Sequence, residues 1–217
     1  MEANKEGALH LRSAPPLLFG RSATAAIPAQ NARNVVSPHY PLNHSWCLWF
    51  LDGESTATSW EERLDRVAAV STLEQFGVLY QSMKAPSELS SGSDLYFFKR
   101  GIRPQWDHPA NVKGGRWVIS MGDDMERMDC AWLRILTSIV GNWFDDLEKE
   151  ICGVAANVRK RKSKICVWTK CGSEKNVTMQ LGRLVKEFTE ISGRITYELH
   201  EGRENDVHKA GKVLYSL

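Results

Sequence analysis

Long hydrophobic runs are missing from this sequence, because no stretch approaches the roughly 18 apolar residues that a membrane-spanning helix needs. The amino terminus carries Glu2 and Glu6 and lacks the apolar segment of a secretory signal. The five cysteines are odd in number and none belongs to a Cys-x-x-Cys pair, which argues against a disulfide framework and against a zinc site. These absences favour a soluble protein of a reducing compartment. We expect it in the cytoplasm, with the nucleus as a second compartment.

Motifs of common enzyme sites are also missing. The glycine patterns that cradle phosphates are absent, the six histidines show no metal-ligand spacing, and no nucleophile elbow occurs. The adjacent acids at 123–124 and 145–146 would point to different sides of a helix or strand, so we interpret them as turn or helix-end residues. We therefore expect a binding protein without catalysis, cofactor or metal. An enzyme acting on a nucleotide is the competing class.

Charge is balanced over the whole chain, whereas tryptophan is plentiful. The net charge is only +2, so any signal for nucleic-acid binding must be local. Eight tryptophans in 217 residues exceed what packing of one domain requires. Some of them are therefore expected outside the core.

Two segments differ in composition. Residues 1–38 are rich in Ala, Ser, Pro and Asn and lack periodicity, so we predict a flexible arm there. Residues 39–217 have the pattern of one globular domain, which we expect to be monomeric. Apolar and β-branched runs predict strands at 45–51, 94–99, 116–121, 152–158, 164–169 and 194–200.

Three helices are predicted between these strands. Ser71 to Glu74 reads as a capping box that opens the first helix, whose apolar stripe contains Leu73 and Phe76. Helical periodicity also covers 125–140 and 173–191. Because strands and helices alternate without a regular βαβ rhythm, we predict an α+β fold in which helices pack on one face of an antiparallel sheet.

Two tryptophans lie where burial is hard to explain. Trp60 has polar neighbours on both sides, and Trp106 lies in a loop bounded by Pro104 and Pro109. With Asp107 beside one of them, the pair suggests a flat apolar slot with a carboxylate at its rim. Guanine has two faces for stacking and an N–H edge that donates to one carboxylate, and stacking is worth about 1–3 kcal/mol per base. A methylated, cationic base would add a cation–π attraction.

Basic residues follow in two places. Lys113 and Arg116 flank a Gly-Gly turn, and residues 159–164 form a basic hairpin between two apolar strands. A basic hairpin alone is most often a solvated turn. If one strand runs from Lys164 to Trp168, however, the even spacing puts both side chains on one face. Beside an aromatic slot, triphosphate binding is the better interpretation.

These segments resemble the eukaryotic translation initiation factor 4E family, which binds the 7-methylguanosine cap of messenger RNA. The resemblance extends from about Tyr40 to the carboxyl end. It rests on the segments 59–60, 98–106, 113–117, 152–159 and 165–169. It implies a single domain with a curved antiparallel sheet of about eight strands and three helices on the convex face.

The resemblance also implies roles for individual residues. Trp60 and Trp106 match the two tryptophans that sandwich the methylated base, Asp107 matches the acid that receives the guanine edge, and Trp168 matches the residue at the methyl group. The remaining cap-binding positions match residues that hold the phosphates: Arg116, Arg159, Arg161 and Lys164. The family more often has Glu at position 107, so the shorter Asp107 predicts weakened rather than abolished recognition.

The surface that binds initiation factor 4G and the 4E-binding repressors in the family is altered here. A family tryptophan falls at Gly77, an acid falls at Arg134, and a leucine falls at Thr137. We predict weak binding of the usual helical Tyr-x₄-Leu motif, because interface anchors are typically Trp, Tyr or Arg. Drift of an unused surface, or a change introduced at Gly77, are the alternatives. The residues of this degenerate surface are Tyr40, Pro41, Leu42, Leu73, Gly77, Leu133, Arg134 and Thr137.

Three functions stay open. The chain could support translation initiation through an unusual partner, or occupy caps as a repressor or specialised paralogue that does not recruit factor 4G. A protein-interaction domain that has lost cap binding is the third possibility, and the retained tryptophans argue against it.

Overall fold

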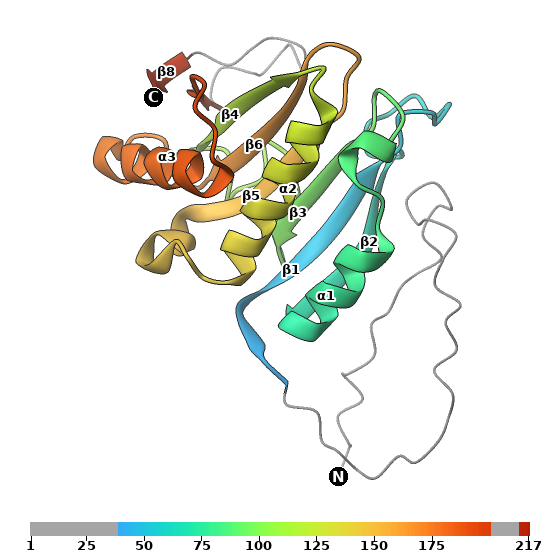
Figure 1. Ribbon diagram of the computed structural model, residues 1–217, viewed down its shortest axis with the longest axis horizontal. Coiled ribbons are helices and arrows are strands. Elements are labelled where there is room, and N and C mark those ends of the chain that lie inside the picture. Colours follow the sequence, from blue (N-terminus) through green and yellow to red (C-terminus); the bar gives the residue numbers. More distant parts are fainter. Residues whose placement is uncertain (1–38, 201–212) are drawn as a thin grey trace.

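A computed structural model of the chain describes residues 39–200 and 213–217 (Figure 1). The predicted arm at 1–38 lies outside the described residues. Within the described part, the chain forms one antiparallel sheet with helices on one side. In this part no helix is long and apolar enough to span a membrane.

The sheet has eight strands among the described residues, in the spatial order β2-β1-β3-β5-β6-β4-β7-β8. The strands are β1 Pro41–Leu51, β2 Leu64–Thr72, β3 Asp94–Lys99, β4 Gly115–Gly122, β5 Ile151–Asn157, β6 Ser163–Thr169, β7 Thr196–Leu199 and β8 Val213–Ser216. Every neighbouring pair is antiparallel. The predicted α+β class, antiparallel sheet and strand number are confirmed.

Two of these strands were not predicted from the sequence. β2 lies at one edge and reads Leu-Asp-Arg-Val-Ala-Ala-Val-Ser-Thr, with too little β-branched and aromatic content to signal a strand. β8 lies at the other edge and has only four residues. Both strands form because a neighbouring strand offers hydrogen-bonding groups. That pairing depends on the tertiary structure and cannot be predicted from the local sequence.

The helices all lie on the convex face of the sheet, as predicted (Figure 1). They are α1 Leu73–Ser82, α2 Met125–Val140 and α3 Lys175–Thr189, with short 3₁₀ helices at Pro86–Glu88 and Asp145–Glu150. The predicted stripe of α2, including Trp132 and Ile135, is buried. Asp124 caps this helix by accepting a hydrogen bond from the Arg127 amide, so the acid pair at 123–124 is a helix start.

The start of α1 differs from the predicted capping box. Thr72, not Ser71, is the N-cap, and its hydroxyl accepts from the Gln75 amide at 3.3 Å. The Gln75 side chain in turn accepts from the Ser71 amide at 2.8 Å. The cap moved by one residue because β2 continues to Thr72. Leu73, predicted on the apolar stripe, is 48% exposed.

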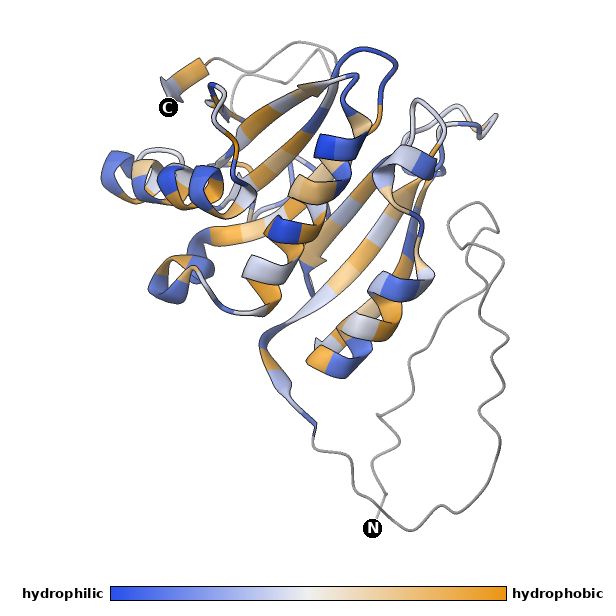
Figure 2. Ribbon diagram, viewed as in Figure 1, coloured by the Kyte–Doolittle hydropathy of each residue, from blue (hydrophilic) through white to orange (hydrophobic). Residues whose placement is uncertain are grey.

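Side chains alternate between the two faces of the sheet, and each face has its own apolar cluster. Figure 2 shows hydrophobic residues recurring along the strands beneath the helices. Leu95 and Phe97 of β3 belong to the large core beneath the helices. Tyr96 and Phe98 of the same strand belong to a smaller cluster on the opposite, concave face. The concave face is therefore apolar although no helix covers it.

Two helical glycines provide a test of this packing. A methyl group added at Gly182 of α3 would lie 2.3 Å from Cζ2 of the buried Trp117, whereas one added at Gly77 of α1 would meet nothing within 4 Å. We expect Gly182→Ala to lower the free energy of unfolding by about 1–3 kcal/mol through overpacking. Gly77→Ala should raise it by about 1 kcal/mol, since alanine favours a helix. Urea unfolding measures both, and equal effects would contradict the packing of α3 on Trp117.

Candidate functional site

The concave face is built around a cluster that we call the aromatic floor. Its rings are in edge-to-face contact: Tyr96 lies 6.2 Å from Phe98, and Phe98 lies 5.4 Å from Trp168, centroid to centroid. The floor consists of Leu51, Leu64, Tyr96, Phe98, Cys152, Ala155, Cys166 and Trp168. Trp49, Trp60 and Trp106 pack against it as half-buried side chains.

Trp60 reaches the floor from the loop between β1 and β2. Its ring is 6.3 Å from the ring of Tyr96, at an angle of 77°. Arg63 closes the base of the loop, because its Nε and Nη2 atoms donate to the Asp52 carbonyl oxygen at 2.9 and 2.8 Å. The Asp52 amide donates back to the Arg63 carbonyl at 3.1 Å. The hydrogen bonds between Arg63 and Asp52 thus fix the loop that carries Trp60 without contacting its ring.

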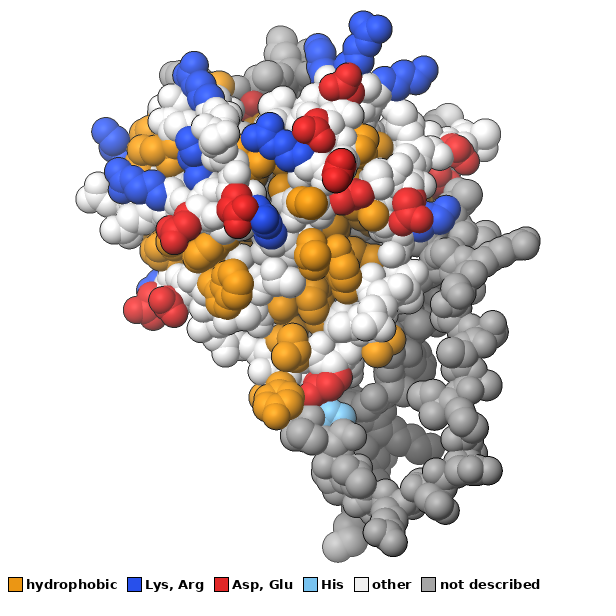
Figure 3. Space-filling view, in the orientation of Figure 1, with side chains coloured by type: hydrophobic (Ala, Val, Ile, Leu, Met, Phe, Trp, Pro, Cys, Tyr) orange, Lys and Arg blue, Asp and Glu red, His pale blue; other side chains and the backbone are white. Residues whose placement is uncertain are grey.

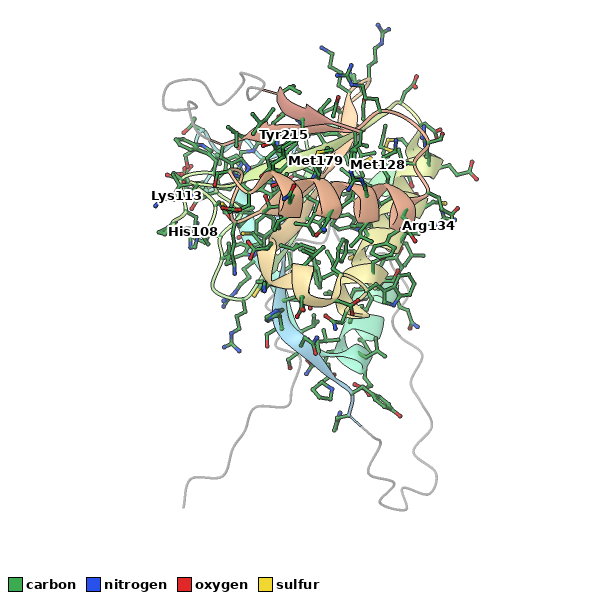
Figure 4. The ribbon with its side chains drawn as sticks, turned by 90° about the vertical axis from the view of Figure 1, so that its left-hand side faces the viewer. His108, Lys113, Met128, Arg134, Met179 and Tyr215 are labelled. Carbon is green, nitrogen blue, oxygen red and sulfur yellow. The ribbon has the colours of Figure 1, made fainter. Side chains whose placement is uncertain are left out.

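Trp106 reaches the floor from the loop between β3 and β4. The buried Asn111 holds this loop, since its Nδ2 donates to the carbonyl oxygens of Arg103 and Gln105 at 3.0 and 2.7 Å. The Asn111 carbonyl is itself 2.9 Å from Nδ1 of the buried His200. Figure 4 shows His108 and Lys113 of this loop on the side of the sheet opposite to Arg134 of α2.

The two tryptophans do not touch each other. Ring contacts among the described residues include no pair of Trp60 with Trp106, although both indoles pack on the same floor. Asp107 follows Trp106 and is exposed. In the described part of the chain, its carboxylate has neither a hydrogen bond nor an ion pair. The geometry therefore offers two separate indole faces and one unpaired carboxylate.

Arg159 lies at the end of the concave face where β5 and β6 meet. Its Nη1 donates to Asp94 Oδ1 at 2.7 Å, and Asp94 also accepts from the Tyr96 hydroxyl at 3.0 Å. Burial lowers the pKa of the guanidinium, but the hydrogen bond and charge of Asp94 outweigh it and raise the pKa overall. The ion pair with Asp94 holds the guanidinium in place, and 41% of the Arg159 side chain is still exposed to a ligand.

Lys164 and Arg161 belong to the same basic hairpin. β6 runs without interruption from Ser163 to Thr169, so Lys164 and Trp168 share the concave face, as the even spacing predicts. Lys164 is half-buried, and Arg161 is exposed in the turn. Neither takes part in an ion pair within the described residues.

Arg116 differs from the other cations because it already has a carboxylate partner. Its Nη2 is 2.9 Å from Glu198 Oε2, and only 11% of either side chain is exposed. Arg116 is the register partner of Trp168, so it lies beside the floor. The sequence indicated a phosphate-binding arginine here, and the structure adds a buried ion pair with β7.

Trp168 forms the end of the floor near β7. Its ring centroid is 4.3 Å from that of His200, and the indole is only 6% exposed. Among the described residues, its buried Nε1 has no hydrogen-bond partner. Because so little of the indole is exposed, Trp168 offers no open face for a base to stack on.

Of the predicted cap-site residues, Trp60, Trp106 and Trp168 meet at the aromatic floor, and Arg116, Arg159 and Lys164 lie on strands or strand ends beside it. Asp107 and Arg161 are exposed in the adjoining loop and turn. Sequence reasoning missed the residues that hold the predicted ones in place: Asp94, Tyr96, Asn111, Glu198 and His200. Asp94 comes within the segment 94–99 that was predicted as a strand, and nothing local marks it as the partner of Arg159, 65 residues away.

Comparison with known proteins agrees with this fold. The family model described as eukaryotic initiation factor 4E matches residues 41–213. Eukaryotic translation initiation factor 4E type 1B of Mus musculus is 36% identical over 170 residues, which cover 76% of this chain and 69% of the relative. The chain therefore belongs to the initiation factor 4E family.

Solved structures give the same result. The complex of C. elegans eIF4E-3 with the 4E-binding protein Mextli and cap analog matches with a TM-score of 0.71 and 35% identity, covering 75% of this chain and 94% of that one. The complex of Ascaris suum eIF4E-3 with m7G cap matches with a TM-score of 0.73 and 36% identity, covering 82% and 98%.

Two ion pairs of different burial test the role of Glu198. Glu198→Gln leaves the buried Arg116 charge uncompensated, so we expect the free energy of unfolding to fall by about 3 kcal/mol. The matched control is Glu190→Gln, which breaks the exposed pair with Arg134 and should cost less than about 1 kcal/mol. Urea unfolding of both variants provides the comparison. A similar small loss in both would show that Glu198 does not hold Arg116.

Proposed function

We propose that this chain binds the 7-methylguanosine cap of messenger RNA between Trp60 and Trp106 and takes part in translation initiation or its regulation. The observation that carries the proposal is the convergence of two tryptophans from separate loops on one aromatic floor, beside the unpaired carboxylate of Asp107. Residues 39–217 would act as the cap-binding domain, with 1–38 as an arm.

The chemistry of a methylated guanine suits this arrangement. Two indole faces stack on the two faces of the base, each worth about 1–3 kcal/mol. The positive charge from N7 methylation adds a cation–π attraction of about 0.5–2 kcal/mol. The carboxylate of Asp107 accepts from N1–H and the N2 amino group, which selects guanine. The small exposed part of Trp168 would contact the methyl group.

The phosphates would extend toward the basic end of the concave face. Arg159 is oriented by Asp94, and Lys164 projects from the same face as Trp168. Arg161 adds an exposed cation in the adjacent turn. We assign Arg116 a shared role, because its guanidinium is bound to Glu198 and would reach a phosphate only with its remaining donors.

The proposed activity is binding without catalysis, since the family is named for an initiation factor and the cap site needs no reacting group. We place this activity in the cytoplasm, where translation occurs, with the nucleus as a second compartment. Initiation factor 4G and the 4E-binding proteins are the partners that the family suggests.

The convex partner surface supports only weak binding of those partners. Gly77 contributes no side chain, and the space around it is open. Arg134 is occupied by an ion pair with Glu190 at 2.5 Å, and the Thr137 hydroxyl donates to carbonyl oxygens of its own helix. Apolar side chains nevertheless gather over the helical face (Figure 3), including the exposed Leu73 and Leu133.

Tyr40, the residue before β1, is hydrogen-bonded to the start of α1. The Tyr40 amide donates to Glu74 Oε1 at 3.1 Å, and the Leu73 amide donates to the Tyr40 carbonyl at 2.9 Å. Tyr40 and Pro41 are exposed, and Leu42 packs against the core. The surface is therefore formed but lacks its main anchor. This favours the second candidate role, a cap-occupying repressor or specialised paralogue that does not recruit factor 4G.

Tryptophan fluorescence tests the cap site. Titration with 7-methyl-GTP should quench the emission and show tighter binding than GTP, because only the methylated base is cationic. Trp106→Ala should weaken binding by about 5- to 150-fold, the equivalent of one lost stacking partner. Trp143→Ala is the matched control, since Trp143 is 57% exposed and lies outside the concave face. Equal affinity for GTP and 7-methyl-GTP would contradict the cationic sandwich.

Restoring an anchor tests the partner surface. A peptide with the Tyr-x₄-Leu motif should bind the natural chain weakly and the double variant Gly77→Trp/Arg134→Glu more tightly, by about 30-fold or more. The Cβ of the new side chain would enter open space, because nothing lies within 4 Å of a Cβ at Gly77. Gly77→Ala serves as the control for helix stability. Calorimetric titration measures the affinities, and tight binding by the natural chain would overturn the loss-of-anchor interpretation.

A further inference from the structure

Three arginines surround Trp49 on the concave face, outside the proposed phosphate site. We call Arg66, Arg100 and Arg103 the arginine patch. They come from β2, from the residue after β3, and from the loop that carries Trp106. All three are exposed, while Trp49 is half-buried against the aromatic floor.

Several observations place the patch together. Arg66 is the register partner of Trp49 on the neighbouring strand, so both side chains are on one face. The guanidinium carbon of Arg103 lies 5.9 Å from the Trp49 ring centroid, within cation–π range. Burial raises the pKa of the Cys47 thiol, and the positive charges of Arg66 and Arg100 offset part of that rise, so both arginines are near this side chain.

The patch has no counter-charge of its own. Among the described residues, none of the three guanidinium groups takes part in an ion pair or donates a hydrogen bond. Gathering like charges without a carboxylate is unfavourable for folding, and it creates a local positive potential. By contrast, Arg116 and Arg159 on the same face are each bound to an acid. Planar guanidinium groups that lack partners suit phosphate oxygens.

The patch is continuous with the proposed cap slot but distinct from its phosphate end. Trp49 is the register partner of Tyr96, whose ring contacts Trp60. Asp94 holds Arg159 at the start of β3, whereas Arg100 follows the end of that strand. Six residues at about 3.3 Å each put roughly 20 Å between Asp94 and Arg100 along β3. Arg66 is on β2, three strands from β5, which is roughly 14 Å at about 4.8 Å per strand. A triphosphate bound at Arg159 would therefore leave Arg66 and Arg100 free.

We propose that the arginine patch and Trp49 form a second RNA contact, which binds the phosphate backbone of single-stranded RNA beside the cap slot. A basic surface interleaved with an aromatic ring is the arrangement that binds single strands without sequence preference. This inference deepens the proposed function, because it extends the cap site to the RNA body. An acidic protein segment is the competing ligand.

The test uses an uncapped 12-nucleotide oligouridine and the full chain saturated with 7-methyl-GTP, so that the cap slot is occupied. Fluorescence anisotropy should show binding that weakens with salt. Arg66→Ala/Arg103→Ala should lower the affinity about tenfold. It should also make the slope of log affinity against log salt shallower by about 1.4, since each lost contact removes about 0.7.

The control variant is Arg183→Ala, an exposed arginine on α3, which should leave oligouridine binding unchanged. Affinity for 7-methyl-GTP alone, measured in every variant, should also stay unchanged, which separates this inference from the proposed cap site. Unchanged oligouridine affinity in the double variant would overturn the inference. Equal or tighter binding of polyglutamate, lost in the same double variant, would overturn it as well and assign the patch to an acidic protein.

Discussion

Side chains alternate across a sheet that is apolar on both faces, and the site depends on that alternation. Along β3, Leu95 and Phe97 face the helices while Tyr96 and Phe98 face the concave side. A slip of one residue in register would exchange the two sets. The large core beneath the helices specifies the register, because it holds most of the buried apolar side chains. The aromatic floor therefore has a defined position although no helix covers it.

Polar groups buried in this frame orient the charges of the site. Asp94 holds Arg159 and accepts from Tyr96, which places the cation at one end of the floor. Glu198 holds Arg116 from β7, and Asn111 holds the loop that carries Trp106. Asp94 and Glu198 act on arginines that are 65 and 82 residues away in the sequence, whereas Asn111 acts within its own loop. The ion pairs with Asp94 and Glu198 restrict the rotamers of Arg159 and Arg116, so that less side-chain entropy is lost when a ligand binds.

The two faces of the sheet present different kinds of side chain. The concave face combines two indoles, an unpaired carboxylate and oriented cations. On the convex face, Leu73 and Leu133 are exposed, Gly77 has no side chain, and Arg134 is paired with Glu190. The proposed cap slot is thus built on the β1–β2 and β3–β4 loops, and the proposed partner surface on α1 and α2.

The sequence by itself determined the central strands and the three helices, because periodicity and aromatic content are local properties. The same local patterns indicated Trp60, Trp106 and Lys164 as candidate slot residues. Tertiary structure alone decided the edge strands β2 and β8, the shift of the α1 cap from Ser71 to Thr72, and the partners of Arg116 and Arg159. These features arise from pairing between distant segments, and no local pattern encodes which carboxylate will meet which guanidinium.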